Sequence, residues 1–587
     1  MSITVTTALN AGLQAHRTGN LDKAIAVYGA VLDLAPDNPK ARHLRGFALL
    51  QADRAADALI DLQLAVGSAP DNGTAWTHLA ICQERLGHPG APAARRAVAL
   101  NPAALEALDL LVREQTVDTR ALSWLLALAP DDASAWNRAG LERAPYAPSL
   151  ATTHFRRALC LAPTAASIAL DLAEVERRTQ HPETALARIN RALALRPNDP
   201  RALADRAGAE IELDAVGDAL SDTRRAAVQD PASRAAWGNR AEALYRLSRY
   251  PEALKYGTRA RVTAPADPDA MANLAVYCLA NGDLAGGWRL FRQRRARRTT
   301  PGPALPRWSG EPEANLLVLA EQGLGDELLF STLWQDLDRR VADGHLASAT
   351  VEADERLIPL GARALHNLNW KPRQGGETGT AGASHWCLAG DLLEMFRQDR
   401  ESFASSAPGL VPDRDRVDLW RHWLARVAGA RPTIGLCWRS GSRAGHRRRH
   451  YPALGECAPL LALENHLFVA LQYDDCAAEL AEASVGQGTA IILPPDLDRR
   501  DDQEGVAALM AALDIVVSAD TAVLALAGAL GVPAVAISLH RGWVGLGQEQ
   551  HPWFPRMARV YRPPGVPWRE TMTGVARTVE RQLTGRI

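Results

Sequence analysis

The chain has 587 residues, with 66 lysines and arginines against 67 aspartates and glutamates. Because a single hydrophobic core stops growing at about 250–300 residues, this length predicts at least two domains. The balanced charge argues against a nucleic-acid partner. The seven cysteines include no CxxC pair, so neither a disulfide framework nor a zinc site is indicated.

Targeting and membrane signals are the next feature. The opening stretch MSITVTTALNAG has no basic segment followed by an apolar one, so it shows no secretory signal. The longest apolar region, 505–539, is interrupted by Asp514 and Asp520 and predicts buried strands and a helix instead of a membrane span. We therefore expect a cytoplasmic protein.

Prolines mark an internal repeat in the first half of the chain. They are Pro36, Pro70, Pro102, Pro130, Pro163, Pro197, Pro231 and Pro265, with gaps of 34, 32, 28, 33, 34, 34 and 34 residues. Alanine stands twelve residues before most of them, and small residues stand five before and ten after. Small residues at fixed offsets let paired helices approach closely, and each proline would end the second helix of a pair.

This pattern resembles the tetratricopeptide repeat (TPR). The resemblance implies about eight antiparallel helix pairs over 1–295, stacked into an α-helical superhelix with a groove. Stacking is required because one helix pair cannot bury its own apolar face. The segment 102–130 is shorter than its neighbours, which predicts a kink or a degenerate repeat.

A column of short polar residues runs through the repeats. Asp171, Asp205, Asn239 and Asn273 each follow a proline by eight residues. One interpretation is that they are ordinary exposed helix residues. The other is a ladder that binds the backbone of an extended acceptor protein, since TPR family members face the groove here. TPR-bearing protein glycosyltransferases have an asparagine ladder at this position, whereas two rungs here are aspartate.

Composition changes after the repeats. Proline and glycine accumulate over 296–312, which predicts a linker. Beyond it, apolar runs at 315–320, 432–437 and 466–471 alternate with helical patterns such as 414–428 and 452–463. Alternating strands and helices predict an α/β region with two doubly wound parallel sheets, that is, two Rossmann-like halves.

Four motifs in this region carry a second resemblance. "EQGLGDELLF", "GLCWRSGSRAGHRRRHYP", "FVALQYDD" and "SADTAVLALAGALGVPAVAIS" occur in this order within 313–565. Together they resemble heptosyltransferase-like glycosyltransferases of GT-B fold. The resemblance implies an acceptor-side half at 313–412, a nucleotide-sugar half at 430–565, and a terminal helix at 566–587 that crosses back to the first half.

Asp326 takes the position of the family's catalytic base. A carboxylate there can accept the proton of an attacking hydroxyl, while the alternative is that Asp326 only caps the helix that follows. Gln322, Gly323 and Gly325 would form the loop that carries it, with the glycines leaving room for the acceptor.

The donor would bind in the second half. N–H groups near Asp520, Thr521 and Ala522, at a strand-to-helix turn, would face a phosphate. The resemblance adds Arg439, Ser440 and Ser442 as phosphate contacts and Gln472 as a contact of the base. Relatives have histidine where this chain has Ala525, so the donor identity of the heptose enzymes does not carry over. The arginine-rich stretch 443–451 predicts either a flap over an anionic donor or a solvated loop.

A TPR array joined to such a region resembles bacterial flagellin glycosyltransferases. This implies a metal-independent protein O-glycosyltransferase without a cofactor, acting on Ser or Thr. The donor would be a CMP-linked nonulosonic acid such as pseudaminic acid. One alternative is a cell-envelope glycan transferase whose TPRs recruit a partner complex. Another is a non-catalytic TPR scaffold.

Overall fold

The computed structural model describes residues 5–113, 119–294, 302–373, 380, 382–404, 409–441, 449–487, 491–539 and 542–585. The chain divides into two compact units, Met1–Thr179 and Gln180–Ile587. This division falls inside the helical array, so the second unit contains the later repeats together with the whole α/β region. No helix in the described ranges combines the length and the apolar character that a membrane crossing requires.

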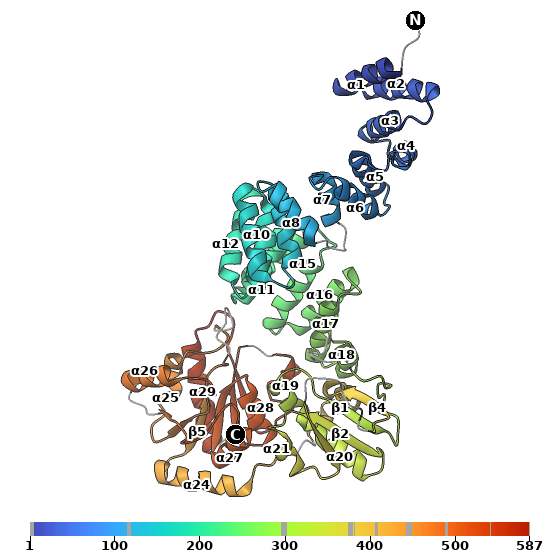
Figure 1. The fold of residues 1–587 in the computed structure, drawn as a ribbon. Coiled ribbons are helices and arrows are strands. Elements are labelled where there is room, and N and C mark those ends of the chain that lie inside the picture. The colour runs from blue at the N-terminus through green and yellow to red at the C-terminus, as the bar shows by residue number, and fades with distance from the viewer. Residues whose placement is uncertain are drawn as a thin grey trace. The chain divides into compact units, whose positions relative to one another are not determined.

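The first unit is a run of antiparallel helix pairs (Figure 1). Its helices are α1 (Val5–Arg17), α2 (Leu21–Leu34), α3 (Pro39–Gln51), α4 (Ala55–Ser68), α5 (Gly73–Arg85), α6 (Ala91–Leu100), α7 (Leu105–Arg113), α8 (Thr119–Leu128), α9 (Ala133–Arg143), α10 (Pro148–Leu161) and α11 (Ala166–Arg178). The segment expected to be irregular, 102–130, includes residues 114–118, which lie outside the described residues, so this expectation stays a prediction.

The second unit begins with further helix pairs of the same kind. They are α12 (Pro182–Leu195), α13 (Pro200–Glu212), α14 (Val216–Gln229), α15 (Arg234–Arg246), α16 (Tyr250–Thr263), α17 (Pro268–Ala280) and α18 (Leu284–Phe291). The TPR-like helical array expected over the first half of the chain is thus confirmed, as is the α/β class of the second half.

The prolines end helices as expected, and they also introduce the next helix. Two residues after Pro36, Pro70, Pro197 and Pro231 stand Asn38, Asn72, Asp199 and Ser233. Each of these side chains accepts a hydrogen bond from the backbone N–H three residues on, over 3.0 to 3.3 Å. Such N-caps satisfy donors that a helix leaves open at its first turn.

The columns of small residues lie at the helix contacts. Ala24, Ala58, Ala185, Ala219 and Ala253 all have no exposed surface. At Gly140, an added Cβ would lie 2.5 Å from the Phe155 ring. The helices therefore pack too closely for larger side chains at these positions, which explains the offsets from the prolines.

Residues with positive φ form another repeated feature, which the pattern of apolar residues does not reveal. The turn inside successive helix pairs has a residue with positive φ, in the left-handed region that favours glycine. These residues are Gly19, Asp53, Gly87, Gln180, Asp214, Ser248 and Gly282. Glycine thus occupies only some of the positions where the backbone would favour it.

The α/β region contains two parallel sheets. The first has the order β3-β2-β1-β4, from β1 (Asn315–Leu319), β2 (Ser348–Ala353), β3 (Leu368–Pro372) and β4 (His385–Leu388). The chain turns from β1 toward β2 and β3, and then returns to place β4 on the other side of β1. The carboxyl ends of β1 and β4 are therefore the switch point where ligands bind in open α/β sheets.

The second sheet has the order β10-β9-β8-β5-β6-β7. Its strands are β5 (Thr433–Cys437), β6 (Leu467–Ala470), β7 (Ile491–Ile492), β8 (Ile515–Ala519), β9 (Ala534–Ser538) and β10 (Met557–Tyr561). All neighbouring pairs are parallel. Here the switch point lies between β5 and β8.

Helices cover and connect the two sheets. They are α19 (Leu324–Phe330), η1 (Ser331–Leu333), α20 (Trp334–Ala342), α21 (Ile358–Ala362), η2 (Ala389–Asp391), α22 (Leu392–Phe396), α23 (Glu401–Ala404), α24 (Arg414–Ala428), η4 (Leu454–Cys457), α25 (Ala458–Leu461), α26 (Ala477–Gln487), α27 (Gln503–Ala512), α28 (Ala522–Ala529), η5 (Trp543–Gly545) and α29 (Trp568–Leu583). The helix expected at 414–428 matches α24, whereas 452–463 forms two short turns, η4 and α25.

Aromatic side chains join the last repeat to both sheets. Trp288 of α18 contacts Trp543 and Trp553 at ring-centroid distances of 6.4 Å. Phe403, which follows the first sheet, lies 5.1 Å from Trp553. The Trp288 indole N–H also donates to the Arg397 carbonyl over 2.7 Å. One continuous buried core therefore spans the end of the array and both sheets.

Two expectations change at the edges of this region. Of the linker expected at 296–312, residues 296–301 lie outside the described residues, but Trp308 is buried and its N–H bonds the Trp386 carbonyl at 2.8 Å. The terminal helix α29 packs on β8, β9, β10 and α25. The expectation that this helix crosses to the first half is therefore wrong, because its apolar face is covered by the second sheet.

Candidate functional site

The glycine-containing loop after β1 brings Asp326 to the first turn of α19. Gly323 is the N-cap of α19, and its N–H lies 3.5 Å from Asp326 Oδ2. This long contact is the backward arm of a capping box, so the capping geometry expected as an alternative is present. Asp326 is half-buried, so its carboxylate can both cap the helix and face a ligand.

Backbone strain in this loop lies at Gln322. Its φ is 62°, whereas Gly323 has φ of −102°, and Gly325 is not among the residues with positive φ. The glycines are thus not needed for a left-handed turn. The Gln322 carbonyl accepts a hydrogen bond from Arg373 Nη1 over 3.2 Å, which holds the strained residue in place.

Gly325 brings the two predicted loops together. A Cβ built on Gly325 would lie 3.6 Å from the backbone N and Cα of Ala522. Helices α19 and α28 pack against each other, although their first residues, Leu324 and Ala522, are far apart in the sequence. The turn that carries Asp326 therefore abuts the N-terminus of α28, where a donor phosphate is expected from the sequence.

The start of α28 lies at the switch point of the second sheet. Thr521 is its N-cap, and its side chain makes no capping hydrogen bond. The Thr521 hydroxyl lies 3.4 Å from the Ser518 hydroxyl and 3.9 Å from Cys437 Sγ. Ser518 and Cys437 pair across β8 and β5. First-turn N–H groups at such a point form an anion site, while Asp520 is exposed beside it.

Arg439 and Ser440 follow β5, but the Arg439 guanidinium is turned toward carboxylates. It lies 2.5 Å from Asp474 and 2.6 Å from Glu479. These hydrogen bonds raise the pKa of Arg439 against the opposing effect of burial. Two carboxylates already neutralise the Arg439 guanidinium in this structure, and its expected contact with a donor phosphate stays a prediction.

The Gln472 side chain also forms its hydrogen bonds within the protein. It has no exposed surface, and its amide donates to the Arg439 carbonyl at 2.9 Å and to Asp474 at 2.8 Å. The amide therefore has partners within the protein, and the expected contact of Gln472 with a nucleotide base stays a prediction. Gln472 holds the loop after β5 in place.

Glu327, next to Asp326, is a site residue that the sequence motifs did not single out. Its side chain is buried, and the Asp354 N–H donates to Oε1 over 2.5 Å. Arg373 Nη1 lies 3.8 Å from Oε2. Burial is the main cause that raises the pKa of Glu327 to about 7. A charged residue at a position that should be apolar in the helix pattern is the signal that could have identified it.

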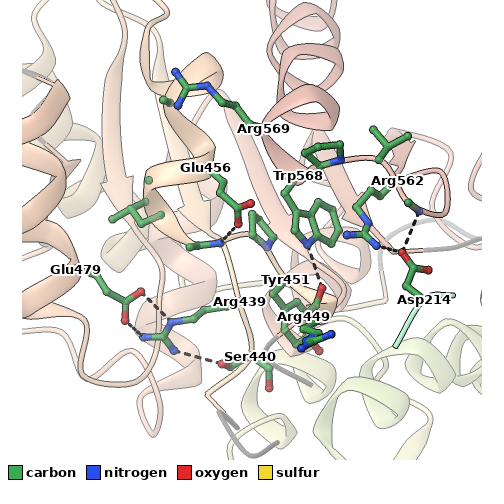
Figure 2. Close-up of a pocket in the computed structure, with 18 of the residues that line it drawn as sticks. Asp214, Arg439, Ser440, Arg449, Tyr451, Glu456, Glu479, Arg562, Trp568 and Arg569 are labelled. Carbon is green, nitrogen blue, oxygen red and sulfur yellow. Dashed lines mark hydrogen bonds and ion pairs between the residues drawn. The ribbon is translucent and has the colours of Figure 1, made fainter. Parts of the chain in front are cut away.

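A pocket of about 1520 Å³ lies between the later repeats and the second sheet, all within the second unit. Figure 2 shows its wall: Arg562 contacts Asp214, and the Trp568 indole donates to the Arg449 carbonyl at 3.1 Å. Arg439 and Ser440 line it, whereas its lining, among the described residues, includes neither Asp326 nor Thr521. The pocket therefore adjoins the predicted donor loop and lies apart from the predicted catalytic turn.

The polar column of the repeats makes contacts within the array. Asp171, in the first unit, is buried and accepts from Asn137 Nδ2 over 3.2 Å. In the second unit, Asn239 Nδ2 donates to the Ala204 carbonyl at 2.8 Å. Asp205 pairs with Arg201 at 3.5 Å, and Asn273 is exposed. At least part of this column stabilises neighbouring repeats.

Some predicted residues lie outside the described ranges. Ser442 and residues 443–448 of the arginine-rich stretch belong to this group. The last arginine of that stretch, Arg449, is described and pairs with Glu183 of α12 at 2.7 Å.

Comparison with known proteins supports the repeats. A family model described as tetratricopeptide repeat matches residues 9–73, 170–233 and 216–268. Protein FlbA of Caulobacter vibrioides is 31% identical over 320 residues, which are 51% of this chain and 53% of that protein. The chain thus spans about half the length of this curated relative. The chain contains tetratricopeptide repeats.

Two solved structures show weak likeness. The crystal structure of the APC/C hetero-tetramer Cut9–Hcn1 aligns with a TM-score of 0.32 at 13% identity, over 46% of this chain and 55% of that one. Yeast Tom70 aligns with a TM-score of 0.30 at 14% identity, over 50% and 84%. Neither score is high enough to carry a conclusion about this chain.

Proposed function

We propose that this protein is a protein O-glycosyltransferase whose repeats select the acceptor. The observation that carries the proposal is the close approach of the Asp326 turn to the N-terminus of α28 at Gly325. A carboxylate that can accept a proton lies on one side, and a helix terminus that favours an anion lies on the other. Transfer from a nucleotide sugar needs both.

The roles of these groups follow from the chemistry. Asp326 accepts the proton of a Ser or Thr hydroxyl as this hydroxyl attacks the sugar. The first-turn N–H groups of α28 stabilise the nucleotide phosphate that leaves. Following the resemblance of the motifs, we propose a CMP-linked nonulosonic acid such as pseudaminic acid as the donor and flagellin as the acceptor.

A nucleotide titration tests the donor side. CMP, UDP, GDP and ADP are titrated against the full chain without magnesium, and we expect one of them to bind. Ala522→Asp places a negative charge at the N-terminus of α28, so it should stabilise the helix yet repel the phosphate. Ala522→Asn is the matched neutral control. Nucleotide binding that Ala522→Asp leaves unchanged would argue against this site.

A non-catalytic TPR scaffold is the second candidate. The observation in its favour is that Arg439 and Gln472, which should meet the donor, are occupied by partners inside the protein. A scaffold would retain an acceptor protein on the repeats and bind none of the four nucleotides.

A further inference from the structure

Arg294, the last described residue at the end of the repeat array, reaches the switch point of the first sheet. It follows α18, and its side chain is only 5% exposed. Arg294 Nε donates to Glu321 Oε2 at 3.0 Å, and Nη2 also contacts Glu321. Nη1 donates to Asp391 Oδ1 at 3.2 Å. Glu321 follows β1 and Asp391 follows β4, so one guanidinium spans both strand ends.

The two carboxylates are fully buried and have further partners. Glu321 Oε1 accepts from the Gly390 N–H at 2.8 Å. Asp391 accepts from the Leu388 N–H at 3.1 Å and also contacts Arg307. A Cβ at Gly390 would lie 2.6 Å from Arg294 Nη2, so glycine leaves the space that the guanidinium fills.

Burying three charged side chains at this position costs free energy, so we asked what the ion pairs contribute besides stability. Burying charges carries a desolvation penalty that an ion pair often fails to offset, so apolar residues would stabilise the core at least as well. What the charges add is geometry, because a guanidinium fork fixes the carboxylates that it binds. Glu321 is directly followed by the strained Gln322, and Asp326 lies four residues further on, in the first turn of α19.

We propose that Arg294 is a positioning residue: the last helix of the repeat array sets the conformation of the loop 321–326 through Glu321. The inference rests on the proposed function for its catalytic consequence. It implies that the array is part of the site, and is not only a tether for the acceptor. Acceptor binding on the repeats then acts directly on the turn that carries Asp326.

Three variants of the full chain test this role. Arg294→Met leaves Glu321 without its cation and should lower thermal stability. Arg294→Met with Glu321→Gln removes both charges and keeps an oxygen for the Gly390 N–H, so stability should return toward that of the wild type. Arg292→Met is the control, because Arg292 joins the same helix to Glu394 at 3.2 Å and to the Trp308 carbonyl at 2.8 Å, away from the loop.

The deciding readout is hydrogen exchange of the backbone amides over 320–327, which needs no substrate. We expect faster exchange in Arg294→Met and in the double variant, and unchanged exchange in Arg292→Met. In a transfer assay, the double variant should lose about 10²-fold in kcat with little change in KM, as a misplaced catalytic group does.

The outcomes separate the two proposals. Wild-type exchange in the stable double variant would overturn the positioning role, because the pair would then be structural only. If wild-type protein transfers no sugar, the proposed function fails, while the exchange data still decide whether Arg294 positions the loop.

Discussion

The helical array and the α/β region differ in how far apart in sequence their defining contacts lie. In the array, the Asn38 side chain accepts a hydrogen bond from the N–H three residues on. The Trp76 indole donates to a carbonyl six residues back. Where the α/β region meets the end of the array, Arg294 and Asp391 form a contact across 97 residues of sequence, and Trp288 and Arg397 form one across 109. Local contacts repeat and can be recognised as a pattern, whereas the site depends on contacts that occur once.

The largest expected effect on stability lies in the array. Phe155 is fully buried and fills the space beside Gly140. Phe155→Ala should cost about 3–5 kcal/mol in the free energy of unfolding, through lost burial and a cavity. Denaturant unfolding followed by circular dichroism measures it.

Gly140→Ala provides the control for this contact. Alone it should destabilise, since its Cβ would lie 2.5 Å from the Phe155 ring. In the Phe155→Ala background it should cost little, because the collision is gone. Additive losses would show that the two positions are not in contact, and the local account of the array would be wrong.

Buried glutamates give both regions a pH dependence. Burial raises the pKa of Glu327 in α19, and also that of Glu210 in α13, to about 7 from 4.5. The folded protein keeps these protons until about pH 7, whereas the unfolded chain releases them near its ordinary pKa. Each group therefore stabilises the fold fully below pH 4.5, and this contribution is lost as pH rises toward 7.

The two neutral variants compare the regions directly. The loss of stability between about pH 4.5 and about pH 8 should shrink in Glu327→Gln, by up to about 3 kcal/mol. Glu210→Gln should show a change of similar size, because the pKa of Glu210 is raised to the same value. Melting temperatures across this pH range measure both. A wild-type slope in Glu327→Gln would mean that Glu327 titrates normally.

Left-handed residues allow a third comparison. Ser248 in a repeat turn has φ of 57° and Gln322 in the site loop has φ of 62°. Because the left-handed region costs a side-chain-bearing residue about 1–2 kcal/mol, Ser248→Gly and Gln322→Gly should each stabilise the fold by about 1 kcal/mol. Only Gln322→Gly should also lower transfer, since it loosens the loop. If the two variants transfer sugar at the same rate, the conformation of Gln322 does not affect the site.

The polar column of the repeats allows a comparison of acceptor binding with stability. Asn239→Ala with Asn273→Ala should weaken acceptor binding by a few-fold to about thirty-fold, if each net hydrogen bond is worth ~1 kcal/mol. Titration of acceptor protein against the full chain measures it. Asn239→Ala alone should also lower stability slightly, because its bond to the Ala204 carbonyl is lost. Unchanged affinity would make the column purely structural.

The contrast between local and distant contacts also explains which elements of the fold could be predicted from the sequence. The proline period and the alanine columns located the array, and apolar runs located β1, β5, β6, β8 and β9. The sequence did not reveal β2, where Glu352 interrupts the apolar residues. It also did not reveal the edge strands β3, β4 and β10, since Lys371, His385 and Arg559 interrupt their apolar character. Edge strands of this kind are partly exposed and need no apolar run.

The site was predicted in part for a similar reason. Motifs placed Asp326 and Thr521 at strand-to-helix turns, and the structure brings these turns together. Arg439 and Gln472 were assigned to a ligand because a sequence does not show that Asp474 and Glu479 would occupy them. Arg294 carried no signal at all, because its partners Glu321 and Asp391 are distant in sequence and the residues after it have the composition of a linker.

The measurement that tests the central claim most directly compares wild type with Asp326→Asn in a transfer assay. Purified chain, CMP-activated nonulosonic acid and flagellin are combined, and the intact mass of the acceptor is recorded beside a thermal melt of each variant. Asparagine keeps the size and the capping ability of aspartate but not its basicity. We predict a mass gain with wild type and about 10²–10⁴-fold slower gain with Asp326→Asn at an unchanged melting temperature. Full activity of Asp326→Asn would contradict the account, since Asp326 would then be only a helix cap.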